Sequence, residues 1–98
     1  MLNRKDLTNS VKELIDDWDN QIQGLQRGVH KIKGESRNVY NERIDELREQ
    51  RNALEEEVDS IQESNDKGLE EIQDGLETAK DSFNETIEEI KSLFESNK

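Results

Sequence analysis

The stretch that decides the fold is IQESNDKGLEEI, Ile61–Ile72, in the middle of a chain that is otherwise patterned as helix. Ser64, Asn65, Asp66 and Gly68 are weak helix formers that stand close together within it. Apolar residues on both sides nevertheless keep the spacing of one helical face. Two folds are therefore open: the chain turns back here and forms a bundle, or one long helix runs through and forms a rod.

Two local signals at this stretch favour different folds. Asp66 is a candidate N-cap, and acidic Glu70 and Glu71 follow it near the start of the next helix, where negative charge is favourable. Glu63 and Lys67, by contrast, stand in the order that favours an ion pair inside one continuous helix. We therefore interpret the stretch as a hinge, folded back in one state and extended, or exchanged with a neighbouring copy, in another. The predicted hinge residues are Ser64, Asn65, Asp66 and Gly68.

Outside this stretch the apolar residues recur at steps of three and four, which is the pattern of one face of an α-helix. We call this set the apolar stripe; among the hydrophobic residues, Met1, Leu2 and Ala53 fall outside it. The average step is about 3.6 residues, so the helices should be nearly straight. We expect packing, and any self-association, to use the following stripe residues: Leu14, Trp18, Ile22, Leu25, Tyr40, Ile44, Leu47, Leu76, Phe83, Ile87 and Ile90.

A second weak point lies at KGESRN, Lys33–Asn38, where Ser36 or Asn38 could cap a new helix. Helices of equal length suit an antiparallel bundle, because they bury one another's stripes from end to end. The predicted single domain is therefore all-α, either an antiparallel three-helix bundle with coiled-coil-like packing or a helical hairpin. In the hairpin, one helix runs from about residue 5 to 63 through Gly34. Cutting the chain at both weak points leaves three helices, at residues 5–33, 37–64 and 67–96 approximately.

The composition is that of a small, strongly acidic domain. The chain has 98 residues, of which 40% are charged, and its formal net charge is −11. Such a surface repels phosphate backbones and anionic lipids, which argues against nucleic-acid binding and disfavours membranes. Hydrophobic residues make up 29% of the chain, which leaves a thin core for a monomer and favours a homo-oligomer. The absence of cysteine, of a signal-like start and of a long apolar run favours the cytoplasm.

No catalytic, cofactor-binding or metal-binding residues are predicted. His30 is the lone histidine, and neighbouring carboxylates on a helix point about 100° apart, so they do not converge on a metal ion. No pattern of a nucleophile with its base, and no glycine-rich phosphate loop, is present. The residue types that carry chemistry are therefore more consistent with a solvated helix surface than with an enzyme.

Four residues in or beside the stripe differ in type from the aliphatic residues that make up most of it. Trp18 is interpreted as a core anchor at a helix crossing, with an exposed hot spot for a partner as the alternative. Arg51 occupies a stripe position, where it could form a polar layer between helices or lay its stem along a groove with the guanidinium in water. Gly24 and Gly28 have the spacing of a close-packing face, which predicts either the close approach of a partner helix or a tolerated soft spot.

Three segments carry a resemblance to a known group of proteins: LIDDWDNQIQGL, VYNERIDELREQRNALEEEV and SNDKGLEEIQDGLETAKDSFNETIEEIKSLF. The chain resembles small bacterial coiled-coil proteins, most of uncharacterised function and some associated with stress responses. The resemblance implies no enzyme activity, and it implies a helix that continues through Gly34. The residues that carry it are Leu14, Trp18, Asp19, Ile22, Leu25, Tyr40, Ile44, Leu47, Gly75, Ala79 and Phe83.

The sequence thus predicts a non-enzymatic structural or interaction protein that self-associates through the apolar stripe. Two alternatives remain open. One is a stress-related amphipathic module that binds a lipid or polymer surface, although membrane-surface helices usually carry basic rather than acidic polar faces. The other is a helical adaptor that offers one helix to a larger protein partner.

Overall fold

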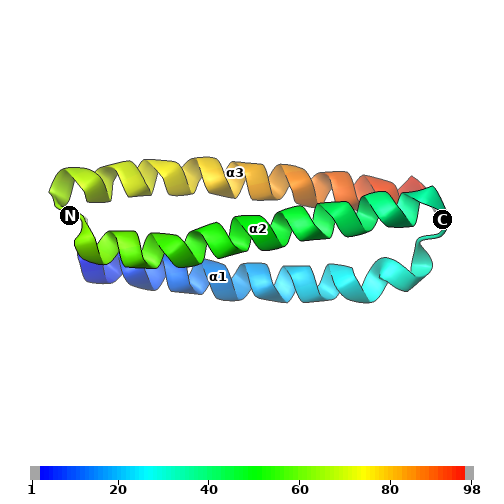
Figure 1. Cartoon of the computed structure of the whole chain (residues 1–98), viewed down its shortest axis with the longest axis horizontal. Coiled ribbons are helices and arrows are strands. Elements are labelled where there is room, and N and C mark those ends of the chain that lie inside the picture. Colours follow the sequence, from blue (N-terminus) through cyan, green and yellow to red (C-terminus); the bar gives the residue numbers. More distant parts are fainter. Residues whose placement is uncertain (1–2, 97–98) are drawn as a thin grey trace.

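The structure, a computed structural model, describes residues 3–96; Met1 and Leu2, predicted to lie outside the stripe, are outside the described residues. Three α-helices lie side by side and antiparallel, with their connections at opposite ends of the molecule (Figure 1). The bundle measures 49 × 18 × 18 Å. The predicted all-α antiparallel three-helix bundle is confirmed, and the rod is wrong. The elements are α1 (Arg4–Arg27), the 3₁₀ turn η1 (Gly28–Lys31), α2 (Glu35–Glu63) and α3 (Asp66–Ser96).

The connection between α1 and α2 corrects two predictions. α1 ends at Arg27, well before the predicted end near residue 33, and no helix runs on through Gly34 as the hairpin and the resemblance implied. The reason is local, because η1 is followed by extended Ile32, and Gly34 has a φ of 67°, a left-handed conformation that strains residues with a side chain. Gly34 also occupies the N-cap position of α2, so neither Ser36 nor Asn38 caps that helix.

The connection between α2 and α3 is a turn of two residues, Ser64 and Asn65. Ser64 is extended, with φ −85° and ψ 149°, and the Asn65 side-chain oxygen accepts a hydrogen bond from the Gly68 backbone N–H at 2.9 Å. Asn65 therefore caps α3, and the prediction that Asp66 is the cap is wrong, since Asp66 is the first residue of the helix. The chain folds back at both weak points.

The apolar stripe forms one continuous core between the helices. Buried side chains come from all three helices and from Ile32 in the connection between α1 and α2. Leu14 and Leu25 are half-buried and pack against the core, whereas Ala53, which lies outside the stripe, is exposed. The other stripe residues expected to carry the packing are buried: Trp18, Ile22, Tyr40, Ile44, Leu47, Leu76, Phe83, Ile87 and Ile90.

α2 packs closely along both neighbours, whereas the backbones of α1 and α3 approach each other at few points. Large side chains fill the space between α1 and α3, where the indole of Trp18 stacks on the ring of Phe83. The interpretation of Trp18 as a core anchor is confirmed, since its side chain is buried among the stripe residues.

Candidate interaction site

The first candidate site is the turn between α2 and α3, because it contains all four predicted hinge residues. Ser64 and Asn65 form the turn, and Asp66 and Gly68 lie in the first turn of α3. The Ser64 hydroxyl donates to the Ser60 carbonyl at 2.6 Å. A Cβ added to Gly68 would lie 2.9 Å from Ser64 Cβ, so the turn closes tightly on this glycine. Gly68 is therefore required for space and not for an unusual backbone conformation.

The start of α1 lies against the same turn. Arg4 Nε donates to the Ile61 carbonyl at 3.0 Å, and Arg4 Nη2 donates to the Ser64 carbonyl. The Ile61 carbonyl also accepts a hydrogen bond from the Ser64 N–H at 3.4 Å, and both carbonyls lie at the C-terminal end of α2, where positive charge is favourable. Arg4 was missed in the sequence, because local sequence does not show which helix ends meet.

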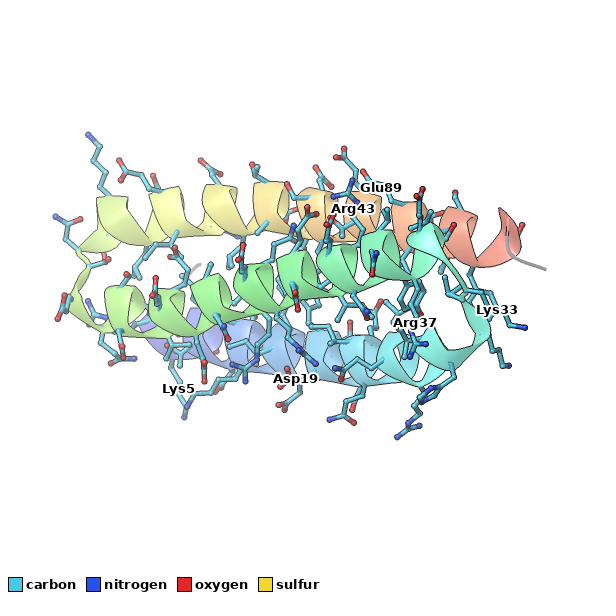
Figure 2. The ribbon with its side chains drawn as sticks, turned by 45° about the vertical axis from the view of Figure 1, so that its right-hand side comes forward. Lys5, Asp19, Lys33, Arg37, Arg43 and Glu89 are labelled. Atoms are coloured by element: carbon cyan, nitrogen blue, oxygen red, sulfur yellow. The ribbon has the colours of Figure 1, made fainter. Side chains whose placement is uncertain are left out.

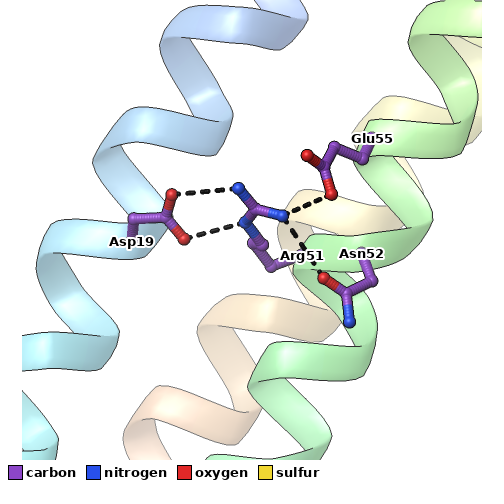
Figure 3. A network of polar contacts seen from close by, with 4 residues as sticks. All are labelled: Asp19, Arg51, Asn52 and Glu55. Carbon is purple, nitrogen blue, oxygen red and sulfur yellow. Dashed lines mark hydrogen bonds and ion pairs between the residues drawn. The ribbon is translucent and has the colours of Figure 1, made fainter.

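Arg51 links α2 to α1 (Figure 3). Its Nε and Nη2 donate to the two carboxylate oxygens of Asp19 at 2.8 and 3.2 Å, and its Nη1 pairs with Glu55 on α2. The Arg51 side chain is 23% exposed, and the hydrogen bond that it donates to Asp19 raises the pKa of Arg51 above its usual value. A polar contact between the helices is thus present, and it lies at the edge of the bundle, since the partners Asp19 and Glu55 are 39% and 57% exposed. Asp19 was not identified as the partner, because the two residues lie 32 positions apart.

Polar contacts also join α2 to α3. Arg43 Nε lies 2.8 Å from a Glu89 carboxylate oxygen on α3, and Arg43 Nη1 lies 2.6 Å from Glu46 on its own helix (Figure 2). Closer to the core, Gln50 Nε2 donates to the Thr86 hydroxyl at 3.4 Å. The side-chain amide oxygen of Gln50, Oε1, is buried and has no hydrogen-bond partner among the described residues. These contacts set the register of the two helices.

The second candidate site, the end groove, lies where α1 and α3 finish and α2 begins, and it has a volume of about 440 Å³. Leu25, Gly28, Tyr40 and Phe94 line it. The Tyr40 hydroxyl donates to the Leu25 carbonyl, and burial raises the pKa of Tyr40. A Cβ on Gly28 would lie 3.0 Å from the Tyr40 oxygen and 3.3 Å from Phe94. A Cβ on Gly24 would meet no described atom within 4 Å, so the predicted close approach occurs at Gly28 alone of the two glycines.

Basic residues gather around the end groove in a chain that is acidic as a whole. Arg27, Lys31 and Lys91 line it, together with a single acid, Glu95. Lys31 Nζ lies 5.9 Å from the centre of the Phe94 ring, close enough for a cation–π contact. The end groove therefore combines an apolar lining with positive charge.

The third candidate site is a groove of about 400 Å³ between α2 and α3, next to the turn. Its lining includes small residues from both helices, among them Ala53 and Gly75, and the half-buried stripe residues Ile72 and Ala79. One margin of the apolar stripe is therefore partly open to solvent along this groove.

Residues 3–96 contain neither a candidate metal cluster nor a candidate membrane-spanning helix. No group of three or more His, Cys, Asp or Glu residues in that range is placed to bind a metal ion. In the same range, no helix has the length and the apolar character that crossing a bilayer would require.

Comparison with known proteins adds no relative. No family model matches the chain, and neither a curated protein nor a solved structure matches it. The resemblance to small bacterial coiled-coil proteins therefore stays a prediction.

Proposed function

We propose that the chain is a non-enzymatic structural or interaction protein that self-associates through its apolar stripe. The observation that carries the proposal is that the stripe runs along all three helices while its margins stay partly exposed. A second copy that covered these margins would gain about 25 cal/mol for each Å² of apolar surface removed from water. The half-buried residues packed against the core are Leu14, Leu25, Val29, Val58, Ile72, Ala79 and Phe94.

The charged residues support a role in packing. Arg51 and Asp19 join α1 to α2, and Arg43 and Glu89 join α2 to α3. Contacts of this kind set the register of helices, which is what a structural or interaction protein requires. A location in the cytoplasm, which suits a chain without cysteine, is part of the proposal.

Sedimentation velocity from micromolar to submillimolar concentration tests self-association. We expect the sedimentation coefficient to rise with concentration, and a single stable monomer throughout would contradict the proposal. Ile72→Glu places a charge on the exposed margin of the stripe and should weaken association. Gln73→Glu adds the same charge at the next, exposed position of α3 and should have a smaller effect.

The end groove favours a second candidate function, an amphipathic module that binds a lipid surface. Its apolar lining and its three cations suit an anionic headgroup with an acyl chain. Vesicles rich in phosphatidylglycerol should co-sediment with the protein at low salt, and phosphatidylcholine vesicles should not. Lys31→Glu with Lys91→Glu should abolish binding, whereas Lys5→Glu with Lys12→Glu should reduce it less. Absence of binding by the unmodified chain would remove this candidate.

A further inference from the structure

We propose that self-association occurs by exchange of α3 between two copies of the chain, and that Arg4 holds the turn at Ser64 and Asn65 closed against this exchange. In the exchanged dimer, α2 and α3 of each chain form one continuous helix, and each α3 packs on α1 and α2 of the other copy. This inference rests on the proposed self-association through the apolar stripe; it names a second copy of the chain as the partner, which re-forms the buried part of the stripe and does not cover its exposed margins.

The apolar stripe keeps its helical spacing across the turn between α2 and α3. Ile72 follows Ile61 by eleven residues, which is close to three full helical turns, and Leu69 follows it by eight, about 80° beyond two turns and still within one broad apolar face. In the closed bundle the chain reverses between them, so the closed form does not require this match. In a straight helix the match is essential, because it places Ile61 and Leu69, both buried, on the same face toward the partner chain. The sequence therefore satisfies a condition that applies to the exchanged form.

The backbone groups at the turn form hydrogen bonds that differ from those of a straight helix. In an α-helix the N–H of each residue bonds to the carbonyl four residues earlier. A straight helix through the turn would pair the Ile61 carbonyl with the Asn65 N–H, and the Ser64 carbonyl with the Gly68 N–H. In the closed turn the Ile61 carbonyl accepts from the Ser64 N–H and from Arg4, the Ser64 carbonyl accepts from Arg4, and the Asn65 side chain accepts from the Gly68 N–H. The closed turn, with Arg4 and Asn65, therefore provides partners for the backbone groups that a straight helix would pair with one another.

The turn between α2 and α3 is short and contains no positive φ angle. Two residues separate α2 from α3, and among residues 3–96 the one positive φ belongs to Gly34 in the other connection. Ser64 and Asn65 can therefore adopt helical torsions without strain, and straightening the turn would place Glu63 and Lys67 in the favourable i, i+4 order. Short connections of this kind promote exchange of an element between copies.

Contacts between α1 and α2 survive the exchange. Asp19 with Arg51, and Thr8 with Gln62, join these two helices within one chain. α3 is the element that is released, and it finds the same contacts on the partner. The exchanged dimer therefore keeps the core of the monomer and changes the chain to which α3 belongs.

Two variants should shift the balance toward exchange. Arg4→Gln removes the charge that bonds to the end of α2. Gly68→Ala introduces a Cβ 2.9 Å from Ser64 Cβ in the closed turn, whereas residues four apart in a straight helix have ordinary spacing. Gly75→Ala is the matched control, because it changes the same residue type on the same helix and its Cβ would meet no described atom within 4 Å. Each dimer contains two hinges, so we expect the association constant to rise about tenfold or more for Gly68→Ala relative to Gly75→Ala.

Distance measurements between spin labels separate exchange from surface docking. Labels at positions 43 and 89, through Arg43→Cys and Glu89→Cys, replace residues that touch across α2 and α3. The doubly labelled chain is diluted into excess unlabelled chain, refolded at high concentration, and separated into monomer and dimer. In the monomer the label distance should be short, and in the exchanged dimer it should reach about 69 Å along one helix.

The outcomes distinguish the two proposals. A dimer with a long label distance, more abundant for Arg4→Gln and Gly68→Ala than for Gly75→Ala, supports exchange. A dimer whose label distance stays short shows surface docking, which overturns the exchange and leaves the proposed self-association standing. Absence of any dimer for the unmodified chain and all variants overturns both.

Discussion

Trp18 of α1 and Phe83 of α3 stack face to face, with ring centroids 3.9 Å apart and ring planes inclined by 5°. The two side chains are 2% and 0% exposed. Because the backbones of α1 and α3 approach at few points, this pair is a side-chain contact that joins the two helices. Stacked aromatic pairs contribute about 0.5–1.5 kcal/mol beyond the area that they bury.

Truncation of Phe83 should therefore destabilise the bundle strongly. Phe83→Ala removes a buried ring and leaves a cavity against Trp18, so we expect the free energy of unfolding to fall by about 3–5 kcal/mol. Urea unfolding followed by circular dichroism measures the loss, and Phe83→Leu should retain the fold with a smaller loss. Phe94→Ala, which truncates a half-buried ring on the same helix, is the control. A loss as large at Phe94 as at Phe83 would be inconsistent with the role of the stacked pair.

The contact between Asp19 and Arg51 should stabilise the bundle modestly and in a salt-dependent way. Because Asp19 is 39% exposed, solvent screening limits the coupling to about 0.5–1 kcal/mol. A double-mutant cycle with Asp19→Asn and Arg51→Gln measures the coupling at low and high salt. Glu77 and Lys80, a more exposed pair within α3, form the control cycle and should show a smaller coupling. Equal couplings in the two cycles would contradict a special role for the contact between helices.

Stability should fall at alkaline pH because of Tyr40. Burial raises the pKa of Tyr40 in the folded chain above that of the unfolded chain, which is about 10. The unfolded chain therefore loses the phenolic proton first, so the stabilisation is present below pH 10 and declines as the pH rises through the folded-state pKa. Tyr40 is the single tyrosine, so ultraviolet absorbance follows its ionisation directly. Tyr40→Phe should flatten this decline, and an unchanged decline would assign the effect to other groups.

Alanine substitutions at Gly24 and Gly28 should have opposite effects. Gly24→Ala adds a methyl group in open space inside α1, so it should stabilise the chain by about 0.5–1 kcal/mol through helix propensity. Gly28→Ala adds a methyl group 3.0 Å from the Tyr40 oxygen, so it should destabilise by about 1–3 kcal/mol through overpacking. Thermal unfolding of the two variants measures both changes. Stabilisation by both substitutions would show that the lining of the end groove relaxes around the added methyl group, and destabilisation by both would contradict the prediction for Gly24.

The helices and the core could be predicted from the sequence because their signal is repeated. Each stripe residue indicates the same buried face of its helix, so a wrong assignment at one position does not change the predicted face. Trp18, Leu47 and Ile90 were placed in the core by spacing alone, and all three are buried. Burial of a regular apolar face requires little information beyond that spacing.

The connections depended on contacts that local sequence does not contain. A glycine inside a helix costs about 1 kcal/mol, so a helix through Gly34 was an acceptable alternative until packing was known. In the structure the break allows Ile32 and Tyr40, each 1% exposed, to enter the core. Asn65 and Asp66 are both good capping residues, and the backbone geometry of the turn selects Asn65.

By itself, the sequence determined that this protein is all-α, that one face of each helix is buried, and that the break at Ser64 to Gly68 is mild. Tertiary structure alone decided that Arg4 meets the end of α2 and that Arg51 meets Asp19. The physical reason is that helix formation depends on neighbours within a few residues. Contacts between helix ends and between helices depend instead on how the whole chain folds back.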